Sequence, residues 1–146
     1  MTSEPTIIDS PSDWVADHIR QYVETNGEEG HMWRGVPTLL LTVTGRKSGA
    51  LRRTALIYGR IGDDYVIVAS KGGHPVNPLW YENLVANKEV TLQVGPEVFQ
   101  ANAQTMPEDA DRETAWNTMV GIWPDFANYQ VKTERRIPLV RLTRIS

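Results

Sequence analysis

The sequence contains no cysteine, no long apolar run and no export signal. Without cysteine the chain forms no disulfide, binds no metal through thiolates and performs no thiol chemistry. Its apolar runs are a few residues long, whereas a membrane-spanning helix needs about 20 apolar residues in succession. The N-terminal decapeptide MTSEPTIIDS has neither the basic region nor the apolar segment of a secretory signal. These absences predict a cytoplasmic protein.

Metal-ligand spacing is absent as well. The three histidines, His18, His31 and His74, lie far apart along the chain, so the sequence predicts no metal site. A length of 146 residues is most simply a single domain. Within residues 1–146 we expect an N-terminal helical segment over 1–30 and a cofactor-binding barrel over 37–144.

Acidic residues are missing from one long stretch of a chain that is acidic overall. The net charge is −3, yet no Asp or Glu occurs between Glu29 and Asp63. Clustered positive charges repel one another unless an anion offsets them, so the stretch predicts an anionic ligand. The acidic remainder argues against a nucleic-acid-binding protein. The basic residues of the stretch are Arg34, Arg46, Lys47, Arg52, Arg53 and Arg60.

Two glycine-rich turns are the predicted ligand-binding elements. The turn at 45–49, GRKSG, lies between two predicted strands, and the turn at 70–75, SKGGHP, follows the next strand. Both combine lysine or arginine with small residues that leave backbone N–H groups accessible, which suits a phosphate or a run of carboxylates. Arg46 and Lys47 could instead be solvated turn residues. Consecutive strand residues face opposite ways, so either Arg52 or Arg53 is expected to be an outward ion-pair partner.

The hydrophobic pattern predicts a mainly β protein. About six mostly antiparallel strands, joined by tight turns and accompanied by three or four helices, favour a closed or split β-barrel. A Rossmann fold is disfavoured because no glycine-rich turn leads from a strand into a long helix. Strands are expected at 38–44, 51–58, 65–69, 89–94, 97–105 and 137–142. Helices are expected from an N-cap at Ser10 to Gly27, and at 77–87, 107–120 and 123–131, with a loop at 28–37.

Four segments together resemble the deazaflavin-dependent nitroreductase family, whose members are split-barrel, FMN-binding-like oxidoreductases that use coenzyme F420. The matching segments, spread over residues 37–144, are LTVTGRKSG, LRRTALIYGR, VIVASKGGHPVNPLWYENL and NYQVKTERRIPLVRL. Coenzyme F420 has a phosphodiester and an oligoglutamate tail, so the resemblance agrees with the clustered positive charge.

The resemblance implies a set of cofactor-binding residues. Basic and hydroxyl groups of the first turn and following strand would hold the phosphate and tail: Arg46, Lys47, Ser48, Arg52 and Arg53. Residues of the second turn would lie beside the ring system: Ala69, Ser70, Lys71 and Gly72. Trp80 and Asn83 would close the pocket. Ala55 occupies a position where the family usually has proline, which changes a contact at a strand end.

The resemblance also implies a substrate pocket and a hydride transfer. Some members of the family place three tyrosines where this chain has Trp123, Phe126 and Tyr129. The loss of two hydroxyls favours a hydrophobic conjugated acceptor, either an activated alkene such as an enone or a quinone, over a nitroaromatic compound. The Ser70 hydroxyl and the Tyr129 phenol are candidate donors to the acceptor oxygen, and either Tyr129 or solvent supplies the proton.

Several alternatives stay open at this point. The same fold could bind FMN, or the protein could carry F420 without catalysing a reaction. Relatives that handle lipid-soluble quinones leave open a peripheral membrane association, and the chain could be a monomer or a homodimer. Trp14, Met32 and Trp33 could belong to the core, to a substrate lid or to a membrane contact.

Overall fold

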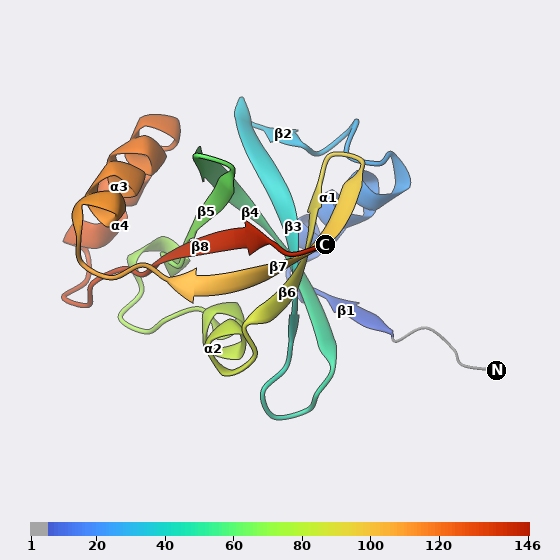
Figure 1. Cartoon of the computed structure of the whole chain (residues 1–146). Coiled ribbons are helices and arrows are strands. Elements are labelled where there is room, and N and C mark those ends of the chain that lie inside the picture. The colour runs from blue at the N-terminus through green and yellow to red at the C-terminus, as the bar shows by residue number, and fades with distance from the viewer. Residues whose placement is uncertain (1–5) are drawn as a thin grey trace.

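Six antiparallel strands close into a barrel in the computed structural model, which describes residues 6–146 (Figure 1). The strand order is β4-β5-β8-β7-β6-β3, and β3 pairs back onto β4. This barrel agrees with the predicted mainly β architecture. The strands are β3 (Val36–Thr44), β4 (Leu51–Ile61), β5 (Asp64–Val68), β6 (Glu89–Val94), β7 (Glu97–Thr105) and β8 (Leu139–Arg144).

Two short strands extend the sheet beyond the six that were predicted. Strand β1 (Ile7–Asp9) pairs in parallel with β4, and β2 (Met32–Trp33) pairs with the start of β3. The prediction of a loop over residues 28–37 was therefore wrong in part. Strands of two or three residues are too short to show an alternating hydrophobic pattern. Pairing with a neighbouring strand stabilises them more than their own composition does, so the sequence does not reveal them.

Strand β3 packs against two different partners because its apolar residues alternate in direction. Leu39 and Leu41 lie in the barrel core, whereas Leu40 faces outward beneath α1 (Asp13–Glu24). There Leu40 contacts the buried side chains of Ile19 and Tyr22. The unbroken apolar run in β3 thus positions the N-terminal helix on the outside of the barrel.

The start of α1 differs from the prediction. The helix begins at Asp13, with Ser12 rather than Ser10 as its N-cap. Ser10 continues the extended path of β1 instead, because its backbone N–H donates to the carbonyl of Arg53. The third helix likewise begins later than predicted, at Ala110, where the Asp109 side chain accepts from the N–H of Arg112.

The remaining helices lie at two other places around the barrel. Helix α2 (Leu79–Ala86) contributes Leu84 to the barrel core. Helices α3 (Ala110–Ile122) and α4 (Asp125–Val131) lie together across the barrel from α1 (Figure 1). A short 3-10 turn, η1 (Lys71–Gly73), joins β5 to the segment that leads into α2. None of the helices described is long and apolar enough to cross a membrane.

Candidate functional site

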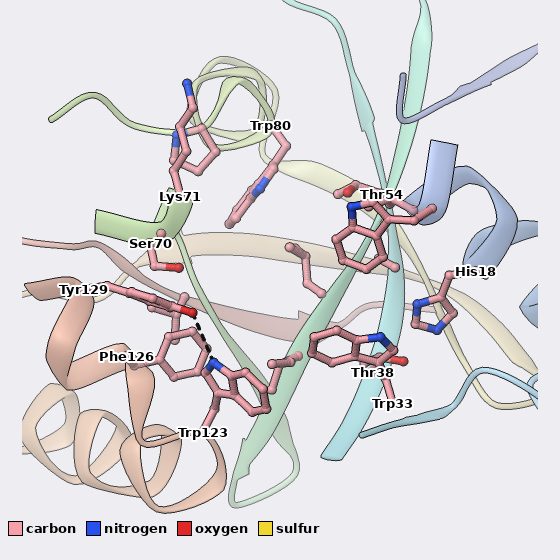
Figure 2. A pocket seen from close by; sticks show the side chains of 18 residues that line it. His18, Trp33, Thr38, Thr54, Ser70, Lys71, Trp80, Trp123, Phe126 and Tyr129 are labelled. Atoms are coloured by element: carbon pink, nitrogen blue, oxygen red, sulfur yellow. Dashed lines mark hydrogen bonds between the residues drawn. The ribbon is translucent and has the colours of Figure 1, made fainter. Parts of the chain in front are cut away.

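A cavity of about 570 Å³ lies between α1 and β2 on one side and α4 on the other, with β4 running across it (Figure 2). Its volume falls within the range of about 300–1,000 Å³ that is usual for small-molecule sites. Its lining residues are Trp14, Val15, His18, Trp33, Thr38, Thr54, Ala55, Leu56, Ile57, Val68, Ser70, Lys71, Gly72, Pro78, Trp80, Trp123, Phe126 and Tyr129.

One side of the cavity is a stretch of β4 whose outer edge pairs with no strand within residues 6–146. The carbonyl of Arg53 accepts from Ser10, so the polar backbone groups of Arg53 face away from β3. Because strand residues alternate, the N–H and C=O groups of Ala55 and Ile57 face the same way. Pairing with β1 ends at Arg53, and pairing with β5 begins only at Tyr58. The edge between them presents alternating donors and acceptors to the cavity.

A second polar element is the turn at Ser70–Gly72. Ser70 has right-handed helical torsions (φ −78°, ψ −39°), whereas Lys71 and Gly72 are left-handed, with φ of 46° and 61°. A right-handed residue followed by a left-handed one directs successive N–H groups toward a common point, which forms an anion-binding concavity. The Ser70 side chain is directed into the cavity (Figure 2). The turn can therefore bind an anionic or strongly polar group.

Arg135 fixes the shape of this turn. Its guanidinium donates to the carbonyls of Ala69, Ser70 and His74 at 3.2, 2.6 and 2.8 Å, and to Asn77 Oδ1 at 2.9 Å. Burial lowers the pKa of Arg135. Sequence reasoning missed this residue, because its partners lie about 60 positions earlier in the chain and no local pattern connects them.

Gly73 lets α4 approach the same turn. A Cβ atom at Gly73 would lie 2.7 Å from the carbonyl oxygen of Tyr129 and 3.0 Å from Cβ of Lys132, and the φ of Gly73 is 83°. A Cβ at Gly72, by contrast, would meet nothing within 4 Å. Gly73 therefore serves the contact between the turn and α4, and that contact brings Tyr129 to the cavity.

The basic hairpin tip is joined to α2. The backbone N–H and a guanidinium nitrogen of Arg46 donate to Oδ1 of the buried Asn83, at 3.1 and 3.0 Å. Arg46 also forms an ion pair with Glu82 at 3.0 Å. Within the same turn, the Ser48 hydroxyl accepts from the N–H of Ala50. Arg46 is thus held beside α2 by neutral and acidic partners.

Three further arginines of the acid-free stretch have partners within the fold. Arg53 pairs with Asp9 at 2.6 Å, as expected for one member of the Arg52–Arg53 pair. Arg34 lies over the ring of Trp33, and Arg60 over the ring of Tyr65. Lys47 and Arg52 are exposed, and neither forms an ion pair with any residue from 6 to 146.

The other side of the cavity is aromatic. Trp14 stacks on Trp33 at 5.8 Å between ring centroids, and Trp33 contacts Trp123 at 5.5 Å. The indole N–H of Trp123 donates to the phenol oxygen of Tyr129 at 3.4 Å. These contacts place Trp14 and Trp33 in the cavity wall, whereas the exposed Met32 does not line it.

The structure gathers about half of the predicted site residues around the cavity. Those that line it are Ala55, Ser70, Lys71, Gly72, Trp80, Trp123, Phe126 and Tyr129. The others lie outside the lining and are Arg46, Lys47, Ser48, Arg52, Arg53, Ala69 and Asn83. Val15 and His18 of α1 were missed, and for Trp14 and Trp33 the sequence left core, substrate lid and membrane contact open, because only the folded chain brings α1 and β2 opposite α4.

Comparisons with known proteins identify relatives of this chain. Residues 14–144 match the family model described as F420H(2)-dependent quinone reductase. An F420H(2)-dependent quinone reductase of Mycobacterium tuberculosis is 45% identical over 130 residues, which cover 87% of each chain.

Solved structures are similar as well. A domain-swapped dimer shares 38% identity at a TM-score of 0.70 and covers 91% of this chain and 99% of its own. An F420-H2-dependent reductase shares 40% identity at a TM-score of 0.67, with coverage of 73% and 93%. The heme storage protein HutZ of Vibrio cholerae, 14% identical at a TM-score of 0.60, shares the fold alone.

Proposed function

The chain belongs to the F420H(2)-dependent quinone reductase family, and on this basis we propose that it transfers a hydride from reduced coenzyme F420 to a hydrophobic conjugated acceptor, with quinones the foremost class. The observation that supports this most directly is the two-sided cavity. A polar backbone edge and an anion-binding turn face a wall of indole rings across about 570 Å³. Such a space suits a planar polar heterocycle next to an apolar flat molecule.

The residues present fit coenzyme F420. The alternating donors and acceptors of Ala55 and Ile57 suit the polar edge of a deazaflavin ring, which carries carbonyl and N–H groups. The Ser70–Gly72 turn and the Lys71 amine suit its ribityl and phosphate portion. Lys47 and Arg52 are available for the acidic tail, and Arg46 could exchange Glu82 for it. Bound F420 in its reduced form supplies the hydride.

The protein's own part is to orient the acceptor and exclude water. The reacting atoms must be held about 3–3.5 Å apart for hydride transfer. The indole wall can hold a flat acceptor by stacking, and the Ser70 hydroxyl and Tyr129 phenol can donate to the oxygen on which negative charge develops. The proton that completes the reduction comes from Tyr129 or from solvent.

The aromatic residues also bear on which acceptor is used. Trp123 and Phe126 lack the hydroxyls that tyrosines at these positions would offer, and Phe126 is buried. Quinones and enones need one donor at a carbonyl oxygen and a large apolar contact, which this wall supplies. Nitro groups present two oxygens to be satisfied, so we expect them to be the poorer acceptors.

The test is an anaerobic assay in which the purified protein oxidises F420H2 with menadione, cyclohexenone or a nitroaromatic compound as the acceptor. The increase in absorbance of the oxidised deazaflavin measures the rate. We expect protein-dependent oxidation, fastest with the quinone. Tight binding of F420 without turnover on any acceptor would instead favour the carrier alternative, and turnover with FMN alone would favour a flavin enzyme.

A further inference from the structure

Tyr129 is hydrogen-bonded in a way that determines where its own hydrogen can go. Its phenol oxygen accepts from Nε1 of Trp123 at 3.4 Å (Figure 2). A phenol has a single O–H, and an indole nitrogen can only donate, so the polarity of this contact is fixed. The phenol hydrogen is therefore not used by Trp123, and it can be donated to a molecule in the cavity.

Both the backbone and the side chain of Trp123 are held in place. Its backbone N–H donates to the carbonyl of Met119 at 2.8 Å, at the C-terminal end of α3. Its ring lies against Trp33, at 5.5 Å between centroids and an interplanar angle of 41°. Trp33 in turn stacks on Trp14 of α1. The indole N–H is thus aimed by contacts from α1, β2 and α3.

The phenol ring is fixed equally well. Phe126 meets it edge to face at 6.1 Å, and the amine of Lys132 lies 5.8 Å from its centroid. The backbone of Tyr129 is in contact with Gly73 of the turn that lines the cavity. With the ring fixed, rotation about the C–O bond is the main freedom left to the hydroxyl, and the Trp123 contact restricts it.

We propose that Trp123 is a positioning residue: its indole N–H directs the Tyr129 hydroxyl so that the phenol hydrogen points at the acceptor oxygen in the cavity. The inference rests on the proposed function, because it names the residue that prepares a donor of the same site. As the acceptor gains a hydride at its electrophilic atom, an electron pair moves onto this oxygen, and the prepositioned donor stabilises the charge. No new bond to the protein forms.

The contact can be observed without cofactor or substrate. In ¹⁵N-labelled protein, the indole resonance that disappears in Trp123→Phe belongs to Trp123. We expect Tyr129→Phe to move this resonance upfield, because its hydrogen-bond acceptor is lost while the ring remains. Trp116 lies on α3, which Trp123 caps, but outside the cavity lining, so its resonance serves as the internal reference and should not move. An unchanged Trp123 resonance in Tyr129→Phe would overturn the proposal.

A double-mutant cycle on turnover tests the functional part. Loss of an oxyanion donor typically lowers kcat about 100-fold to 1,000-fold, and we expect the misdirected donor of Trp123→Phe to lower it by about threefold to thirtyfold with little change in KM. If Trp123 acts through the phenol, it has no further effect in a Tyr129→Phe background. Equal losses in both backgrounds would contradict the proposal. A wild-type protein without turnover would contradict the proposed function instead, and the indole resonance would still decide the contact.

The matched control is Trp116→Phe. It removes an indole from α3 at a partly buried position that packs against the core cluster containing Met119 and lies outside the cavity lining. We expect kcat in this variant within about twofold of the wild type. A loss as large as that of Trp123→Phe would mean that repacking of α3, not the hydrogen bond, explains the effect, and would overturn the proposal.

Discussion

The basic residues fall into two groups: those that interact with other residues of the fold and those that are exposed and accessible to a ligand. Arg34, Arg53 and Arg60 have internal partners, whereas Lys47 is exposed at the tip of the hairpin and Lys71 at the rim of the cavity. An exposed cation gains little from the fold itself, so its contribution should appear in ligand binding. Affinity for a polyanion should therefore depend on the lysines more than on the engaged arginines.

We predict that Lys47→Ala and Lys71→Ala each weaken F420 binding by about threefold to tenfold, the range expected for one partly screened charge. Turnover at saturating cofactor should change less than the dissociation constant. Titration at low and moderate salt measures the effect, and Arg60→Ala is the matched control, because Arg60 donates to the carbonyl of Asp63 and lies over Tyr65. Unchanged dissociation constants in both lysine variants would remove the anion-site interpretation.

Ala55 offers a test of the open β4 edge. Proline at this position removes one backbone donor from the edge and costs no hydrogen bond to β3, because the polar groups of Ala55 face away from that strand. We predict that Ala55→Pro folds with nearly wild-type stability and binds F420 about threefold to tenfold more weakly. Calorimetric titration measures the affinity. Unaltered binding would show that this N–H is not a ligand contact.

At the scale of elements, the turn at η1 depends on one arginine from the segment between α4 and β8. Four hydrogen bonds from a planar guanidinium cannot be reproduced by a lysine, which is a flexible point charge. We predict that Arg135→Lys weakens F420 binding by at least about tenfold and speeds amide exchange in residues 71–74.

The adjacent arginine supplies the control. Among residues 6–146, Arg136 pairs only with the exposed Glu108, and a solvent-screened surface pair of this kind contributes little to stability. Arg136→Lys should therefore leave both cofactor affinity and amide exchange nearly unchanged. If the two substitutions had equal effects, the Arg135 clamp would not be what holds the turn.

The bounds of a helix or strand were predictable where a local hydrophobic pattern and a local turn determine them. Strands β6 and β7 have the predicted bounds, because Gly95–Pro96 defines the hairpin and both strands alternate. Strands β1 and β2 were missed, and the start of α1 was placed two residues early, because pairing with β4 and β3 determines them. In the site, the local glycine-rich motif located Ser70–Gly72 and the family resemblance located Tyr129, whereas tertiary contacts bring in Arg135, Trp14 and Trp33.

On the scale of the whole molecule, Tyr22 joins α1 to the barrel. Its buried hydroxyl donates to the carbonyl of Thr38 at 3.0 Å and accepts from the N–H of Gly95 at 2.7 Å. It thereby links the helix that carries Trp14 and His18 to β3 and to the turn between β6 and β7. One wall of the cavity depends on this attachment.

We predict that Tyr22→Phe lowers the free energy of unfolding by about 1–3 kcal/mol, since Thr38 and Gly95 lose a buried partner. Urea denaturation measures it. Tyr81→Phe is the control, because the Tyr81 hydroxyl meets Thr105 at an exposed site, where the cost should stay below about 1 kcal/mol. A Tyr22→Phe protein as stable as Tyr81→Phe would show that α1 is held by apolar contacts alone.

The central claim is that this barrel binds a deazaflavin polyanion in the cavity between α1 and α4. The most direct measurement is a binding titration of the purified protein with oxidised F420 and with FMN, at low and at moderate salt. We predict micromolar or tighter binding of F420 that weakens as salt is raised, with much weaker binding of FMN. Absent F420 binding, or a preference for FMN, would contradict the claim and the residue roles that follow from it.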